Sequence, residues 1–118
     1  MTTANAAGSG QFQHKINVVG DLRLHSVEQG EGPVTVLIGG WPQTWFAWRQ
    51  VIPLLSDHHQ VIVLELKGQG ESSQALESDF SIEAVAGEVD AFITERGIQS
   101  FVLVGHDVGA WVAYAYSI

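Results

Sequence analysis

Three short apolar runs constrain the fold of this 118-residue chain more than any other feature. They are Val34–Ile38, Val61–Leu64 and Phe101–Val104, and each is apolar on both faces of an extended strand. Strands of this kind are buried on both sides, which is typical of parallel sheets. Helical patterns separate the three runs, so parallel pairing through right-handed crossovers is expected. The sequence therefore predicts an α/β fold.

Helix signals lie between and after these runs. Thr44 is placed to cap a helix whose apolar face carries Trp45, Trp48, Ile52 and Leu55, with Pro53 as its kink or end. Ser81 is placed to cap a second helix, and Gly97 stands where a helix-terminating glycine belongs. A third helix is expected over residues 110–118. Each apolar run is thus followed by helix.

The residues before the first apolar run predict an antiparallel hairpin. Phe12–Val19 and Leu22–Gln29 are the two arms, joined by a turn at Gly20-Asp21. The fold predicted is therefore a mostly parallel sheet entered through a hairpin. Residues 1–10 are small and polar and are expected to form a disordered tail. Residues 11–118 are expected to form the structured part.

Composition excludes several classes of function. Thirteen acidic residues against five basic ones give a net charge of −8, which disfavours nucleic acid and anionic membrane surfaces as partners. The chain has no cysteine, no apolar run long enough to cross a membrane, and no secretory signal, so a cytoplasmic location is expected. The histidines show no metal-like spacing, and neither a metal nor a cofactor is expected. The acidic residues of 65–95 are interpreted as a solvated surface.

The segment Gly105–Gly109 carries the strongest chemical signal. Its Gly-x-x-x-Gly frame lies between a strand and a helix, as in a nucleophile elbow, where a sharp turn projects the central side chain above the sheet. Here the central residue is Asp107, and a carboxylate nucleophile attacks saturated carbon to leave an ester. The alternative is that Asp107 only caps the helix. His106 points the other way and is interpreted as structural or supporting, at the edge of a substrate pocket.

A second loop is placed to assist Asp107. Gly40, Trp41 and Pro42 follow the first apolar run, at the position where elbow hydrolases donate an oxyanion N–H. Trp41 and Val108 are therefore the candidate backbone donors, and Gly40 and Pro42 are expected to shape the pocket. The alternative is an ordinary loop with a packed tryptophan. The glycine-rich loop at 67–73 lacks the ending of a phosphate loop and is interpreted as a structural turn.

Three segments together resemble the α/β-hydrolase superfamily and, within it, the epoxide hydrolases, with the haloalkane dehalogenases as cousins. They are 39–49, 61–73 and 101–114, and the resemblance extends from about Phe12 to Ile118. It implies that Asp107 is the nucleophile, that Trp41 and Val108 supply the oxyanion N–H groups, and that a small apolar epoxide is opened to a diol without cofactor or metal.

The chain departs from the pattern of this family at several positions. Gly39 stands where the family has histidine, and Glu65-Leu-Lys67-Gly68 stands where it has an Asp-x-Arg-Gly-like run. Val108 replaces a tryptophan that binds the leaving halide in the dehalogenases, which disfavours dehalogenation. Tyr114 and Tyr116 lie on the helix after the elbow, outside the family's helical cap.

The resemblance also implies that parts of the family enzyme lie downstream of residue 118. The catalytic histidine, its acid partner and the cap with its tyrosines are among them. We therefore expect an N-terminal portion of such an enzyme, without turnover, whose open sheet edge favours self-association. The alternatives are a haloalkane dehalogenase-like hydrolase, a non-catalytic α/β-hydrolase-like binding module and, more distantly, a nucleotide-binding α/β domain.

Overall fold

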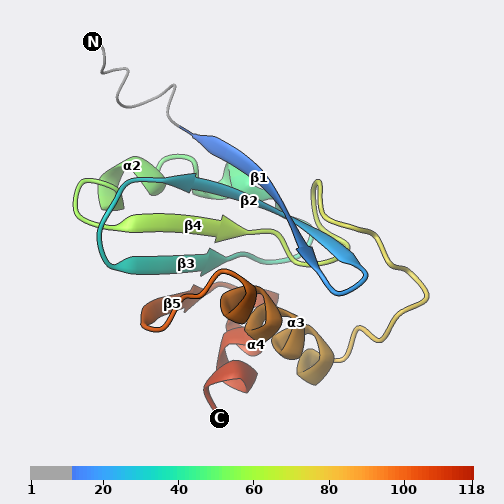
Figure 1. Ribbon diagram of the computed structural model, residues 1–118. Helices are drawn as coiled ribbons and strands as arrows, with labels where there is room; N and C mark the ends of the chain where they lie inside the picture. The colour runs from blue at the N-terminus through green and yellow to red at the C-terminus, as the bar shows by residue number, and fades with distance from the viewer. Residues whose placement is uncertain (1–11) are drawn as a thin grey trace.

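The computed structural model describes residues 12–118 and contains a five-stranded sheet of order β1-β2-β4-β3-β5 (Figure 1). The strands are β1 (Gln13–Val19), β2 (Leu22–Gln29), β3 (Val34–Ile38), β4 (Gln60–Leu64) and β5 (Phe101–Gly105). The helices are η2 (Trp45–Trp48), α2 (Ile52–Leu55), α3 (Ile82–Glu95) and α4 (Val108–Ser117). The predicted tail at 1–10 lies outside the described residues.

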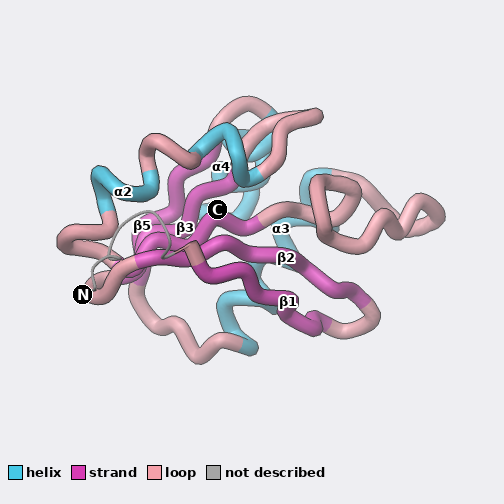
Figure 2. The backbone as a smooth tube through the Cα atoms, turned by 90° about the horizontal axis from the view of Figure 1, so that it is seen from above, coloured by secondary structure: helices cyan, strands magenta, loops and turns pink. Residues whose placement is uncertain are grey.

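Strand pairing follows the predicted topology. β1 and β2 form an antiparallel hairpin in which Val19 pairs with Leu22, and the turn between them uses Gly20 at a φ of 60°. β2 also pairs antiparallel with β4, whereas β3 pairs parallel with both β4 and β5. Figure 2 shows the same sheet from above. The predicted α/β fold class, a mostly parallel set of strands entered through a hairpin, is confirmed.

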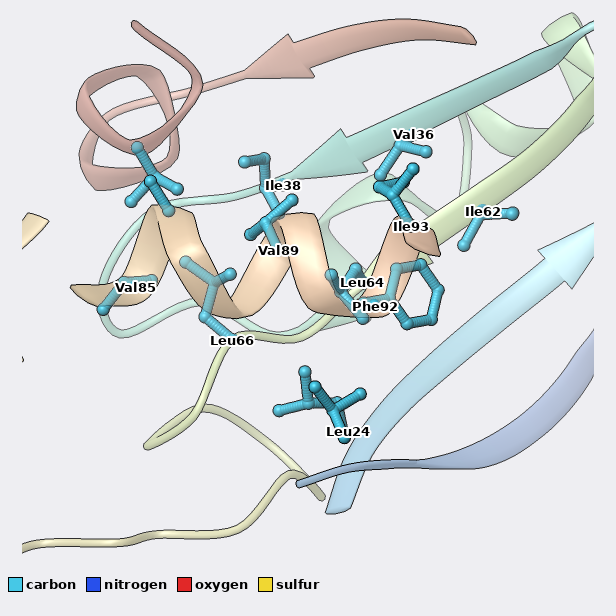
Figure 3. Close-up of a cluster of buried hydrophobic side chains, with 13 residues drawn as sticks. Leu24, Val36, Ile38, Ile62, Leu64, Leu66, Val85, Val89, Phe92 and Ile93 are labelled. Atoms are coloured by element: carbon cyan, nitrogen blue, oxygen red, sulfur yellow. The ribbon is translucent and has the colours of Figure 1, made fainter. Parts of the chain in front are cut away.

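Two apolar clusters lie on opposite faces of the sheet. The larger one contains side chains of α3 and α4 packed on the sheet, and Figure 3 shows Val85, Val89, Phe92 and Ile93 of α3 against Val36, Ile38, Ile62 and Leu64. The smaller one contains Val27, Leu37, Ile52, Val61 and Val63, with Trp45 and Trp48 against it. Neighbouring residues of β4 therefore belong to different clusters, which explains why this strand is apolar at every position from Val61 to Leu64.

The prediction of one continuous helix after Thr44 is wrong. Thr44 does cap it, because its Oγ1 accepts the N–H of Phe46 at 3.3 Å, but the chain forms only the four-residue 3₁₀ helix η2. A turn then leads into α2, whose first turn contains Pro53. Proline lacks an N–H and fits at the start of a helix rather than inside one, so the segment divides into two short pieces.

β5 is only partly buried, contrary to the prediction that both its faces are covered. Phe101 and Leu103 pack on the α3–α4 side, whereas Val102 is 58% exposed and Val104 is 38% exposed on the other side. β5 is the last strand of the described sheet, and η2 and α2 cover the other strands on that side. Within residues 12–118, β5 therefore presents an apolar face and an unpaired edge.

An ion pair between a buried carboxylate and a partly buried arginine joins the hairpin to α3. Arg96, which follows α3, donates from its two terminal nitrogens to the two carboxylate oxygens of Glu28, at 2.7 and 2.8 Å. Burial alone raises the pKa of Glu28, but hydrogen bonds from Arg96 and Ser26 and the charges of Arg96 and Lys15 outweigh it and hold this pKa below its ordinary value. The ionised carboxylate is therefore the form that the folded chain favours.

This ion pair predicts a pH-dependent loss of stability. A carboxyl whose pKa is lower in the folded state stabilises the fold above its unfolded pKa, and that contribution is lost as the pH falls through the lowered value. We expect the free energy of unfolding in urea to decrease below about pH 4.5. Glu28→Gln should lower the free energy of unfolding by about 3 kcal/mol at pH 7 and should weaken its further decrease at acid pH. Glu83→Gln, which removes an exposed carboxylate, is the control. The prediction would be contradicted if the free energy of unfolding fell with pH equally steeply in Glu28→Gln and in the unaltered chain.

Candidate active site

A strained turn connects β5 to α4 and carries Asp107. Its backbone angles, φ 61° and ψ −123°, lie where residues with a side chain are disfavoured. Added Cβ atoms would overlap the backbone of Gly109 if placed on Gly105, and the backbone of Ile38 if placed on Gly109. The turn can therefore close against β3 only because both frame positions are glycine. An observed backbone outlier of this kind supports a functional hypothesis for Asp107.

The loop after β3 brings Trp41 to the carboxylate of Asp107. The backbone N–H of Trp41 donates to Asp107 Oδ2 at 3.4 Å, a long hydrogen bond across 66 residues of sequence. A Cβ on Gly40 would lie 2.5 Å from Asp107 Cβ, so a glycine is needed for this close approach. The N–H of Val108, in the first turn of α4, has no protein acceptor within residues 12–118. Two backbone donors thus flank Asp107.

The remaining predicted residues lie around this centre. Gly40 is buried, and its carbonyl accepts the N–H of Gln43 at 2.8 Å, which closes a turn around a cis Trp41–Pro42 peptide bond. Pro42 and His106 are exposed. The backbone N–H of His106 donates to Ile38 O at 3.0 Å, and its side chain makes no hydrogen bond to Asp107 within the described chain.

An apolar pocket of about 420 Å³ opens beside Trp41 and Val108. Its wall also includes Leu66, Leu76, Phe80, Ile82, Val85 and Val112, of which Leu76 and Phe80 were not singled out from the sequence. The only ammonium group in its wall is that of Lys67, which donates to Ser78 Oγ, Asp79 O and Glu88 Oε2 at 2.6–2.9 Å. A larger, more polar pocket of about 540 Å³ lies near Gly30 and Gln60, at the opposite end of β4. The apolar pocket therefore shares Trp41 and Val108 with the surroundings of Asp107, whereas Asp107 itself is exposed and does not line it.

The carboxylate of Glu65 was wrongly assigned to a solvated acidic surface. Glu65 is only 2% exposed, and its carboxylate accepts three hydrogen bonds, including one of 2.7 Å from His25 Nδ1. The sequence signal that could have located it is its position directly after the buried run 61–64, inside a loop that turns back on the strand end. Within residues 12–118, no three His, Cys, Asp or Glu side chains cluster as a metal site requires.

The comparison with protein families decides the affiliation of the chain. The model of the alpha/beta hydrolase fold matches residues 33–118. The chain belongs to the α/β-hydrolase family. This assignment agrees with the sheet order and with the turn at Asp107, and none of the helices in residues 12–118 is long and apolar enough to cross a membrane.

Individual α/β hydrolases similar to this chain include epoxide hydrolases and a dehalogenase. The chain is 33% identical over 109 residues to the soluble epoxide hydrolase of Corynebacterium sp. (strain C12), covering 92% of this chain and 38% of that protein. It is 39% identical over 90 residues to the bifunctional epoxide hydrolase 2 of Sus scrofa, covering 75% and 16%. It is 33% identical over 102 residues to the fluoroacetate dehalogenase of Burkholderia sp., covering 83% and 34%.

A solved structure has the same arrangement over the part that it shares with this chain. The crystal structure of wild-type Cfl2 from Burkholderia cenocepacia superposes with a TM-score of 0.86 at 39% identity, covering 91% of this chain and 37% of that one. The chain thus spans less than two fifths of the length of each of these four proteins. The similarity to epoxide hydrolases concerns this shared part.

Proposed function

We propose that this chain carries the nucleophile and the oxyanion donors of an epoxide hydrolase-like α/β hydrolase. The observation that carries the proposal is the strained turn that holds Asp107 against the backbone N–H of Trp41. Within residues 12–118 the carboxylate of Asp107 has no other hydrogen-bond donor, which leaves lone pairs free for attack. The similarity to two epoxide hydrolases supports the choice of reaction.

The first step forms an ester. A carboxylate oxygen of Asp107 attacks a ring carbon from the side opposite the ring oxygen, the bond between that carbon and the ring oxygen breaks, and the released alkoxide takes a proton from water. Because the strained ring drives the opening, the nucleophile needs only its negative charge and a correct line of approach. The product is a hydroxyalkyl ester on Asp107.

The second step releases the diol. Water attacks the carbonyl carbon of the ester and loses a proton to a base, and negative charge develops on the carboxyl oxygen. We assign the stabilisation of that oxyanion to the backbone N–H groups of Trp41 and Val108, which flank Asp107. When the intermediate collapses, the bond between the former ester carbonyl carbon and the substrate oxygen breaks, and the departing alkoxide takes back the proton held by the base to give the diol. The carboxyl group loses its proton to solvent, which restores the Asp107 carboxylate. No histidine contacts Asp107 within the described residues, so we expect the ester to persist in this chain.

The pocket beside Asp107 favours an apolar substrate. Its wall is mostly apolar, with Gln69 and Gln74 as neutral polar members, and the ammonium group of Lys67 is already bound by three acceptors. An apolar arm of the substrate would replace water there without leaving a buried charge unpaired. A small apolar epoxide is therefore the substrate class that we propose.

Styrene oxide tests this proposal on the purified chain. We expect intact mass spectrometry to show one adduct per chain, mapped to Asp107 and removed by hydroxylamine, which cleaves esters but not alkylated amines. Diol should not exceed one equivalent. An adduct that hydroxylamine leaves in place, or one that maps elsewhere, would contradict the proposed nucleophile. Multiple turnovers would contradict the expected absence of a base.

Displacement of halide is the second candidate, because the chain is similar to a fluoroacetate dehalogenase. The same attack by Asp107 on a carbon–halogen bond would yield an ester and a halide ion. Val108 offers no side-chain donor to a leaving halide, and the pocket offers no free cation to a haloacid carboxylate. We therefore expect no fluoride release from fluoroacetate under conditions that form the styrene oxide adduct.

The exposed strand edge supports a further expectation, self-association through β5. An uncharged edge strand with exposed valines is a template for pairing with another strand. Val102→Lys should reduce the association seen by sedimentation velocity. Leu54→Lys, at a 78% exposed leucine of α2, is the matched control. An equal effect of the two substitutions would contradict pairing through β5, and a defined dimer without any Asp107 adduct would favour a non-catalytic binding module.

A further inference from the structure

The buried carboxylate of Glu65 connects three separate segments at the carboxyl end of β4. Its Oε2 accepts the backbone N–H of Trp45 at 2.8 Å, and its Oε1 accepts the backbone N–H of Glu71 at 2.9 Å and Nδ1 of His25 at 2.7 Å. A Cβ on Gly70 would overlap this carboxylate, so glycine lets the loop wrap around it. Trp45 begins η2, four residues after Trp41.

The side chain of Gln69 makes a second connection to the same loop. Gln69 is 6% exposed, its Oε1 accepts the N–H of Leu66 at 3.0 Å, and its Nε2 donates to the carbonyl of Gly40 at 3.4 Å. That carbonyl also closes the turn that contains Trp41. The Trp41 turn is therefore held on its N-terminal side by Gln69 and on its C-terminal side by Glu65.

We propose that Glu65 is a positioning residue that sets the backbone N–H of Trp41 against Asp107, with Gln69 as the second tether. An oxyanion donor is effective only when it is held close to its working distance, which a loop without such tethers does not ensure. A carboxylate suits this role because both of its oxygens accept hydrogen bonds, so one side chain can hold N–H groups of two loops. The importance of Glu65 for catalysis rests on the proposed function, whereas its positioning of the Trp41 N–H does not.

The amide proton shift of Trp41 in ¹⁵N-labelled chain provides the test. Asp107→Asn replaces the charged acceptor of this N–H and should move its resonance, and asparagine has nearly the same shape as the aspartate that already adopts these backbone angles. The response is the change in the Trp41 amide shift that Asp107→Asn causes. In a chain that also carries Glu65→Gln, this response should fall by about half or more. The single oxygen of the amide cannot replace both carboxylate oxygens, which accept the N–H groups of Trp45 and Glu71. Gln69→Leu should reduce the response in the same direction.

Glu28→Gln is the matched control, because Glu28 is also a buried carboxylate with several donors but contacts no residue of the Trp41 loop. Its response should equal that of the unaltered chain. An undiminished response in Glu65→Gln would overturn the proposal, and if that variant does not fold, the response in Gln69→Leu decides in the same way. The amide shift can be measured without any reaction at Asp107. If the response depends on Glu65 but styrene oxide forms no adduct, the proposed function is refuted and the positioning role of Glu65 stands.

Discussion

Asp107→Asn is expected to abolish the hydroxylamine-sensitive adduct with styrene oxide. The neutral amide oxygen is a much weaker nucleophile than the carboxylate, and each tenfold loss in rate corresponds to about 1.4 kcal/mol in the barrier. We expect a loss of at least about a thousandfold, which would place the adduct below detection in an intact-mass time course. The fold should survive, because asparagine has nearly the same shape as the aspartate that already adopts these backbone angles.

The control for this substitution removes an exposed carboxylate elsewhere. Asp57→Asn lies in the turn before β4 and should leave the rate of adduct formation unchanged. If Asp107→Asn retained the adduct at the rate of the unaltered chain, the ester would have to lie on another residue. Peptide mapping would then identify that residue, and the elbow would lose its proposed role.

Gly109→Ala is expected to destabilise the chain by about 3 kcal/mol or more, the upper end for overpacking a buried site. The added methyl group would overlap the backbone of Ile38 and Gly39, which cannot move without shifting β3. Since Gly109 follows Val108 directly, the same clash displaces the N–H proposed as an oxyanion donor. Thermal unfolding followed by circular dichroism, together with the rate of adduct formation, measures both effects.

Gly87→Ala gives the matched control for this second prediction. Gly87 is exposed on α3, and a Cβ there meets nothing within 4 Å. Alanine is the better helix former, so this substitution should stabilise the chain by about 0.5–1 kcal/mol. If Gly109→Ala destabilises the chain and Gly87→Ala stabilises it, packing at the turn determines the change in stability, rather than the loss of a glycine as such. Equal signs would contradict the argument for the Gly105–Gly109 frame.

Local signals predicted the parts of the fold whose causes are local. The side chain of Ser81 accepts the N–H of Ala84 at the start of α3, and Gly97 adopts a φ of 67° just beyond its end, as their positions in the sequence indicated. The turn at Asp107 was predicted because two glycines at a fixed spacing express a steric requirement that can be read without the rest of the fold.

Other features depend on contacts between distant residues and were missed. The segment after Thr44 forms two short helices because its apolar side chains must reach the same face of the sheet from a chain that Pro53 interrupts. Glu65 belongs to an acidic region by sequence, but its three donors come from β2, from the first residue of η2 and from the loop at Glu71. The donor in β2, His25, is 40 residues away in the sequence. Buried polar networks of this kind have no local periodicity to reveal them.

The sequence by itself determined the order of the strands, the helices after Ser81 and after Asp107, the hairpin and the turn that presents Asp107, because backbone sterics, helix capping and apolar periodicity act over a few residues. Only the tertiary structure decided which groups meet at that turn. The contact between Trp41 and Asp107, the apolar pocket beside Val108 and the tether from Glu65 all join segments that are distant in sequence. Their geometry depends on how β3, β4 and β5 align in the sheet, which pairing and packing of the whole chain establish.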